Sequence, residues 1–159
     1  MDILFHTAKQ VFSYRVAGIC VKDGRVLLQK PVGDTAFAFP GGHAEFGETN
    51  AETLMREFRE ELGAEISVGA LKWVGEIFFP WGDKPCHQLC LYYLVDITDA
   101  FTPQSGMFYG SEQLENDRFK LEFHWVPIEK LADIELYPTN AAVLMQQLNG
   151  DVQHFIYRE

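Results

Sequence analysis

The segment from Thr49 to Gly63 carries the strongest local signal in the sequence, because it predicts both ends and the buried face of one helix. Thr49 and Glu52 have the spacing of a capping box, which satisfies free N–H groups at a helix N-terminus. Gly63 stands where a glycine commonly ends a helix. Apolar residues recur along one face, namely Ala51, Leu54, Met55, Phe58 and Leu62. This helix must therefore pack against another layer of structure.

Strand-like segments lie on both sides of the helix. Before it, two apolar runs flank the Asp23-Gly24 pair, which is a strong hairpin signal. The expected strands are residues 16–21, 25–29, 36–39 (stopped by Pro40-Gly41-Gly42), 71–79, 87–97, 120–126 and 152–157, and the expected later helical segments are 127–131 and 138–148. We therefore expect one domain over residues 1–159, of the α/β (α+β) class, with a mixed β-sheet between helices.

The chain is acidic, with 23 Asp and Glu residues against 13 Lys and Arg residues and a formal net charge of -10. A protein that binds long DNA or RNA needs a basic surface to replace phosphate counterions, and the sequence has no Lys/Arg-rich cluster. Long nucleic acid is therefore not an expected partner. A small polyphosphate is compatible with this charge if divalent cations mediate its binding.

Other features indicate a cytoplasmic location. No apolar run approaches the roughly 20 residues of a membrane span, and the first residues lack the pattern of an export signal. If Cys86 and Cys90 share one strand, their Cα atoms lie about 13 Å apart, which is too far for a disulfide. A metal site at Cys86, His87 and Cys90 would need a tight turn there, whereas the segment has the pattern of a buried strand. We expect these cysteines and Cys20 to be reduced thiols. We expect no membrane partner for the protein.

Three carboxylates follow one edge of the predicted helix. Glu57, Glu60 and Glu61 fall within an arc of about 100°, directly beside the apolar face. Their mutual repulsion turns into coordination if a divalent cation binds between them, and oxygen ligands suit Mg²⁺ or Mn²⁺. A solvated charged face, paired with Arg56 and Arg59, is the alternative. The preceding loop favours the site, because its glycine pair permits close backbone approach and Glu45 and Glu48 add carboxylates.

Residues 42–64 resemble the Nudix box, G-x5-E-x7-R-E-U-x-E-E-x-G-U, where U is a bulky aliphatic residue. All seven fixed letters are present, and the longer form P-G-G-x-x-E-x-G-E-T is matched from Pro40 to Thr49. Phe58 and Ala64 depart from the pattern at the two U positions, yet both are apolar. The box covers 23 residues, and the order of strands and the final helix around it resembles the Nudix α/β/α sandwich.

The resemblance implies hydrolysis of a nucleoside diphosphate linked to another moiety, with Mg²⁺ or Mn²⁺ as cofactor. By position in the box, Glu57, Glu60 and Glu61 correspond to the metal-binding carboxylates. The same comparison implies that Glu48 supports the site, that the Gly41 carbonyl is a further ligand, and that Arg56 holds a box glutamate in place. Substitution at phosphorus by water then requires mainly positioning and charge stabilisation.

The catalytic base is left open. One of the box glutamates, or a glutamate outside the box, would orient or deprotonate the attacking water. We choose Glu122, just before the strand at residues 123–126, with Glu112 and Glu115 as alternatives. The alternative for each of the three is a solvent-exposed surface glutamate with no role in catalysis.

Two features bear on the substrate and disagree. Pro80, 16 residues past the box, resembles the branch of the family that cleaves ADP-ribose, although it also fits a hairpin turn. Asn140 resembles the purine-reading asparagine of enzymes that cleave oxidised dGTP, although it also suits a helix N-cap. Phe79, Trp81 and Tyr137 are candidates to stack on a base. The expected ligand is thus a small nucleoside diphosphate derivative, with its base unassigned.

Two other functions are compatible with this fold. A non-catalytic Nudix-fold sensor that binds a nucleotide is the main alternative, although such modules usually lose box glutamates. The diphosphate isomerases that share the fold usually have a modified box and a longer chain. A homodimer is left open, because two-fold dimers are common generally.

Overall fold

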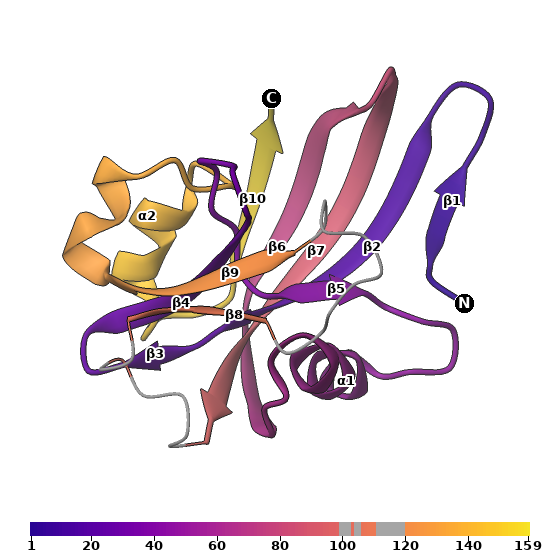
Figure 1. Cartoon of the computed structure of the whole chain (residues 1–159). Coiled ribbons are helices and arrows are strands. Elements are labelled where there is room, and N and C mark those ends of the chain that lie inside the picture. Colours follow the sequence, from indigo (N-terminus) through magenta and orange to yellow (C-terminus); the bar gives the residue numbers. More distant parts are fainter. Residues whose placement is uncertain (99–102, 104–105, 111–119) are drawn as a thin grey trace.

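Two β-sheets and one long helix organise the chain, as Figure 1 shows for the computed structural model. The structure describes residues 1–98, 103, 106–110 and 120–159. The strands are β1 (Leu4–His6), β2 (Val11–Ile19), β3 (Val21–Lys22), β4 (Arg25–Pro31), β5 (Gly41–His43), β6 (Ile66–Trp81), β7 (Lys84–Ile97), β8 (Met107–Tyr109), β9 (Leu121–Pro127) and β10 (Gln153–Arg158). The helices are α1 (Asn50–Leu62) and α2 (Ala141–Leu144), with 3₁₀ helices η4 (Ile128–Asp133) and η5 (Met145–Gln147).

The larger sheet is mixed. Its strand order is β1-β2-β7-β6-β10, and β5 joins it by pairing with β2. The pairs β2–β7 and β6–β10 are parallel, whereas β1–β2, β2–β5 and β6–β7 are antiparallel. The smaller sheet has the order β3-β4-β9-β8. This arrangement confirms the expected α+β class with a mixed sheet.

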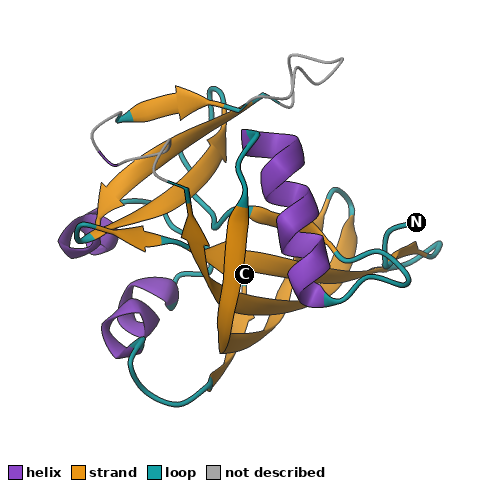
Figure 2. Ribbon diagram, turned by 90° about the horizontal axis from the view of Figure 1, so that it is seen from below, coloured by secondary structure: helices purple, strands orange, loops and turns teal. Residues whose placement is uncertain are grey.

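Helix α1 forms as the sequence predicts. The Thr49 hydroxyl accepts the Glu52 N–H and the Glu52 carboxylate accepts the Thr49 N–H, which completes the capping box. Gly63 ends the helix with φ 64°. Leu54, Phe58 and Leu62 are buried in one apolar cluster with residues from both sheets, so the helix lies across a sheet face, as Figure 2 shows.

A second apolar cluster lies on the other side of the larger sheet. Trp73 and Tyr92 of the sheet pack there with Phe39 and with the segments that carry η4 and α2. The last helix is shorter than the predicted 138–148, because after Leu144 the chain tightens into η5. Helical elements therefore cover both sides of the mixed sheet (Figure 1).

The segment before the box differs from the prediction. The expected strand at residues 36–39 forms only isolated bridges, at Phe37 and Ala38, and the chain instead becomes strand β5 at Gly41–His43. A Cβ atom at Gly41 would lie 2.1 Å from the Val16 carbonyl oxygen. The backbone of β5 thus approaches β2 as closely as it does because residue 41 has no side chain.

Other expectations about the chain can be compared with the structure directly. Cys20, Cys86 and Cys90 are all buried and form no disulfide. Cys86 and Cys90 both lie on strand β7, which begins before the predicted strand 87–97. Burial raises the pKa of the Cys20 thiol to about 12, so this group stays protonated near neutral pH. Among the described residues, no helix is long and apolar enough to span a membrane.

Candidate active site

Arg56 is the centre of an ion-pair cluster on the edge of α1. Its Nε donates to both carboxylate oxygens of Glu48 at 3.0 Å, and its Nη1 donates to Glu57 Oε1 at 2.8 Å and to Glu60 Oε2 at 3.3 Å. Its Nη2 donates to the His43 carbonyl oxygen at 3.2 Å. One guanidinium therefore ties the loop before the helix, strand β5 and two box carboxylates together.

Among the carboxylates that accept hydrogen bonds from Arg56, Glu57 has the least exposed side chain, at 14%. It lies against the backbone at Gly42, where an added Cβ would come within 2.2 Å of the Glu57 Cδ. Burial raises the pKa of this carboxyl, and the Arg56 hydrogen bond and charge oppose that rise. The Glu57 carboxylate thus occupies a position that only a glycine at residue 42 leaves open.

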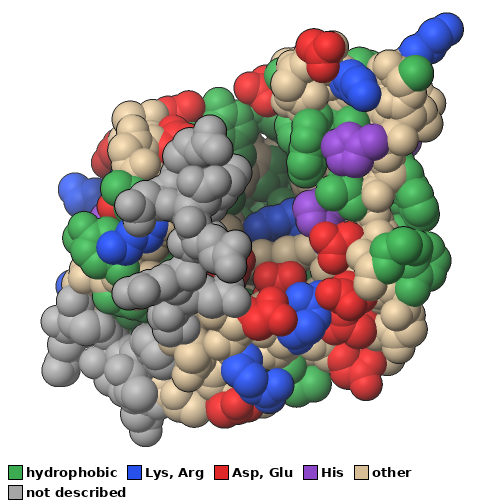
Figure 3. All heavy atoms as spheres, turned by 45° about the vertical axis from the view of Figure 1, so that its right-hand side comes forward, with side chains coloured by type: hydrophobic (Ala, Val, Ile, Leu, Met, Phe, Trp, Pro, Cys, Tyr) green, Lys and Arg blue, Asp and Glu red, His purple; other side chains and the backbone are tan. Residues whose placement is uncertain are grey.

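Glu60 and Glu61 complete the acidic edge. The Glu60 side chain is 46% exposed and takes part in the Arg56 cluster. Glu61 interacts electrostatically with Arg15 of strand β2. In Figure 3, acidic and basic side chains gather on one face beside a hollow. The box glutamates are therefore brought together at the junction of α1, β5 and β2.

The donor chemistry of this edge suits a hard divalent cation. The candidate ligands are carboxylate oxygens and a backbone carbonyl, which are the ligand types that Mg²⁺ and Mn²⁺ prefer. Within the described part of the chain, no three His, Cys, Asp or Glu side chains are arranged to hold a metal as they stand. In this arrangement Arg56 holds Glu57 and Glu60 by hydrogen bonds to one oxygen of each carboxylate.

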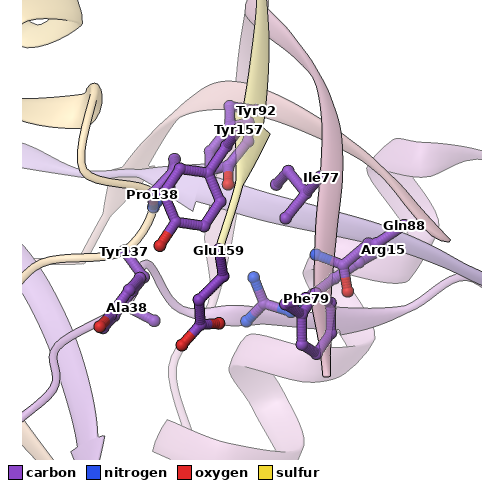
Figure 4. A pocket seen from close by; sticks show the side chains of 10 residues that line it. All are labelled: Arg15, Ala38, Ile77, Phe79, Gln88, Tyr92, Tyr137, Pro138, Tyr157 and Glu159. Carbon is purple, nitrogen blue, oxygen red and sulfur yellow. The ribbon is translucent and has the colours of Figure 1, made fainter. Parts of the chain in front are cut away.

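Figure 4 shows a cavity of about 300 Å³. Its lining residues Ile77 and Tyr92 belong to the second apolar cluster, on the other side of the larger sheet from α1. The cavity is lined by Arg15, Ala38, Ile77, Phe79, Gln88, Tyr92, Tyr137, Pro138, Tyr157 and Glu159. Two of the predicted base-stacking residues, Phe79 and Tyr137, are among them. Burial and then the Glu159 carboxylate raise the pKa of Tyr157. The cavity thus combines aromatic walls with a few polar groups, which is typical of a small-molecule site.

The other two predicted base-binding residues lie outside this lining. Trp81 is near the β6–β7 hairpin, with its ring 6.1 Å from those of Phe79 and His43. Asn140 caps no helix N–H with its side chain, and its Nδ2 donates to the Ile156 carbonyl oxygen at 3.5 Å. Its Oδ1 is buried with no hydrogen-bond partner. Pro80 lies in strand β6 opposite Pro85, as the hairpin interpretation predicts.

Glu122 lies on strand β9, where its neighbours Lys30 and His124 form an ion pair and a hydrogen bond with it. These two partners, the lysine first, lower the pKa of the Glu122 carboxyl. Glu122 alternates along the strand with Phe123, which is buried in the cluster beneath α1, so its side chain leaves the opposite face. The structure therefore pairs Glu122 with groups outside the box. Glu112 and Glu115 lie outside the described residues.

Four polar residues near the site were not predicted from the sequence, namely Arg15, Ser13, His43 and Gln88. The Ser13 hydroxyl donates to Gln88 Oε1 at 3.0 Å and lies 3.1 Å from His43 Nε2. Burial, and then the charge of Arg15, lower the pKa of His43. The sequence signal that could have indicated them is the alternation of polar and apolar residues in strands 11–19 and 84–97. These polar residues share a sheet face with the buried Ala17 and Tyr92.

Fold and site together define the class of this protein. Residues 12–147 match the Nudix domain. The chain therefore belongs to the Nudix hydrolase family, which confirms the resemblance seen in residues 42–64.

Individual relatives within the family have different named activities. An ADP-ribose pyrophosphatase of Methanocaldococcus jannaschii is 35% identical over 85 residues, which span 52% of this chain and about half (49%) of that protein. An RNA pyrophosphohydrolase of Halorhodospira halophila is 51% identical over 141 residues, covering 82% of this chain and 76% of that protein. The crystal structure of a MutT protein from Bacillus halodurans superposes with a TM-score of 0.58 at 21% identity, covering 92% and 90% of the two chains, and supports the fold.

Proposed function

We propose that this protein is a metal-dependent pyrophosphohydrolase that cleaves a nucleoside diphosphate linked to another moiety by attack of water at phosphorus. The observation that carries the proposal is the complete acidic edge of α1, held by Arg56 against the glycine backbone of β5. The names of two relatives, an ADP-ribose pyrophosphatase and an RNA pyrophosphohydrolase, agree in the bond that is cleaved and differ in the substrate.

The residues of the edge have separable roles. Glu57, Glu60 and Glu61, with the Gly41 carbonyl, would hold Mg²⁺ or Mn²⁺. When bound, the cation supplies charge neutralisation for the pyrophosphate and a coordinated water of lowered pKa. Arg56 and Glu48 keep the carboxylates oriented, because a guanidinium that donates to several carboxylates fixes all of them at once.

We expect the general base of the reaction to come from the same edge. Burial raises the pKa of Glu57, and Glu57 is one candidate for the general base. Glu60 and Glu61 are the other candidates for this role. Glu122, paired with Lys30 and with a lowered pKa, is a weaker proton acceptor than Glu57.

The proposed substrate has an anionic diphosphate and, at one end, a planar group such as a nucleobase. The cavity behind the site has Phe79, Tyr137 and Tyr157 in its walls, which suits a nucleobase or another planar group. The acidic chain relies on the cation and on a few basic groups to accept the anion. ADP-ribose, an oxidised or ordinary dNTP, and related nucleotides all share these two parts.

Product analysis by chromatography tests the proposal. The wild type is incubated with ADP-ribose, 8-oxo-dGTP, NADH and diadenosine polyphosphates, with Mg²⁺ and then with a chelator. Metal-dependent release of a nucleoside monophosphate from one of them is the expected result. Absence of turnover on the whole panel, together with binding of one nucleotide, would instead favour the sensor.

A further inference from the structure

Two polar side chains with no role so far, Arg15 and Gln88, line the cavity. They come from adjacent parallel strands, since Ser13 pairs with Gln88 and Arg15 pairs with Cys90. Figure 4 shows their side-chain ends near one another, beside Phe79 and across the cavity from Tyr137. Both are therefore available to one ligand.

Hydrogen bonding fixes the direction of the Gln88 amide. The residue is only 8% exposed, and its Oε1 accepts the Ser13 hydroxyl at 3.0 Å. That hydroxyl has one proton, so the same Ser13 oxygen accepts from His43 Nε2, 3.1 Å away. With its oxygen engaged, Gln88 is left with its NH₂ group, which has no acceptor among the residues that the structure describes.

Arg15 adds a positive charge at the same place. Its Nη2 donates to the Phe39 carbonyl oxygen at 3.0 Å, and a guanidinium has five N–H groups in all. Within the described ranges, no carboxylate forms an ion pair with it, although Glu57 and Glu61 act on it electrostatically. Hydrogen bonds and nearby negative charge stabilise a partly buried cation, and an anionic ligand would add to both.

Strand pairing places this donor pair next to the acidic edge. Arg15 lies opposite His43 in the β2–β5 ladder, and Val16 lies opposite Gly42, against which Glu57 packs. The His43 carbonyl also accepts from Arg56. A group held by Arg15 and Gln88 is thus between the aromatic cavity and the carboxylates.

We propose that Arg15 and the Gln88 NH₂ group bind phosphate oxygens of the substrate, so that the nucleoside occupies the cavity and the diphosphate extends toward Glu57 and Glu61. This inference rests on the proposed function. A guanidinium fork and a neighbouring amide present only donors, which matches a phosphate, an acceptor-only group. Ser13 and His43 are positioning residues, because they act through Gln88.

Calorimetric titration in the presence of a chelator tests the inference without turnover. The probes are AMP and dGMP, each compared with its own nucleoside. The variants are Arg15→Gln, Arg15→Lys and Gln88→Glu. The controls are Arg158→Gln, whose guanidinium lies over the Phe78 ring, and Gln10→Glu, an exposed residue.

The wild type should bind one monophosphate about tenfold or more tightly than its nucleoside, as expected for a charge-assisted hydrogen bond. Arg15→Gln and Gln88→Glu should remove this preference while nucleoside binding persists. Arg15→Lys should retain part of it, because lysine keeps the charge but lacks the fork. Both controls should keep it in full.

A preference that survives Arg15→Gln and Gln88→Glu would overturn the inference, as would a wild type that shows no preference for either monophosphate. If Arg15→Gln also loses nucleoside binding or melts early, Arg15→Lys and Gln88→Glu decide the question. The proposed function stands or falls separately, since hydrolysis with an unchanged preference refutes only the role of these two residues. In the kinetic assay, Arg15→Lys should raise KM more than it lowers kcat.

Discussion

Replacement of Gly42 by alanine is the sharpest local test of the site geometry. The added Cβ would lie 2.2 Å from Glu57 Cδ and Oε1, whereas ordinary contacts begin near 3.4 Å. The Glu57 carboxylate must therefore move by about 1 Å or more, and its 2.8 Å hydrogen bond from Arg56 is lost. The fold should survive, because the obstacle is the end of a side chain.

The size of the effect follows from that lost interaction. A hydrogen bond between charged groups contributes about 1.5–3 kcal/mol, and at this chain length each kcal/mol shifts the melting temperature by about 2–4 °C. We therefore expect Gly42→Ala to melt roughly 3–12 °C lower. Turnover should fall about 100-fold, the scale of a misplacement of 1 Å in an active site.

Differential scanning calorimetry and a metal-dependent hydrolysis assay measure the two quantities. Gly150→Ala is the matched control, since its Cβ would meet only the Gln147 carbonyl oxygen at 3.4 Å. Gly41→Ala should be far worse for folding, because its Cβ meets the Val16 backbone. If Gly42→Ala keeps both the melting temperature and the rate of the wild type, Glu57 does not occupy the assigned position.

Two further predictions concern helix α1. Phe58→Ala should lower the free energy of unfolding by about 3–5 kcal/mol in denaturant titration, because the ring is 1% exposed and fills the cluster beneath the helix; a loss below about 1 kcal/mol would contradict that packing. Hydrogen bonds from the Thr49 N–H and hydroxyl hold the pKa of the Glu52 carboxyl below its ordinary value. The resulting stability is present above the unfolded pKa and is lost as pH falls through the folded one. Glu52→Gln should therefore melt below the wild type near neutral pH, and a melting gap that does not close in acid would refute this.

The local sequence pattern was sufficient to predict those elements whose signals lie within a few residues of one another. The capping box, Gly63 and the buried face of α1 could all be predicted, because they depend on spacing along one helix. The position of Glu57 against Gly42 could be anticipated only in outline, from the glycine pair. Strand β5 was missed, because its formation depends on pairing with β2, a distant segment.

The residues around the cavity were harder to predict for the same reason. Arg15 and Gln88 come from strands about 75 residues apart, and only the parallel β2–β7 pairing brings them together. Tyr137 and Phe79 were predicted as aromatic candidates, and both line the cavity. Trp81 was predicted for the same reason and Asn140 from the resemblance to enzymes that cleave oxidised dGTP, and both lie outside the lining. Neither residue type nor a family resemblance determines side-chain direction.

The central claim is that the acidic edge of α1 is a metal-dependent hydrolytic site. Its most direct test is the hydrolysis rate of the wild type and of Glu61→Gln as a function of Mg²⁺ concentration, on the best substrate of the panel. Glu65→Gln, at an exposed ion pair beyond the helix, is the control. We predict a saturable Mg²⁺ dependence for the wild type and the control, and a loss of rate by orders of magnitude in a folded Glu61→Gln. A Glu61→Gln variant with the wild-type rate at every Mg²⁺ concentration would contradict the claim.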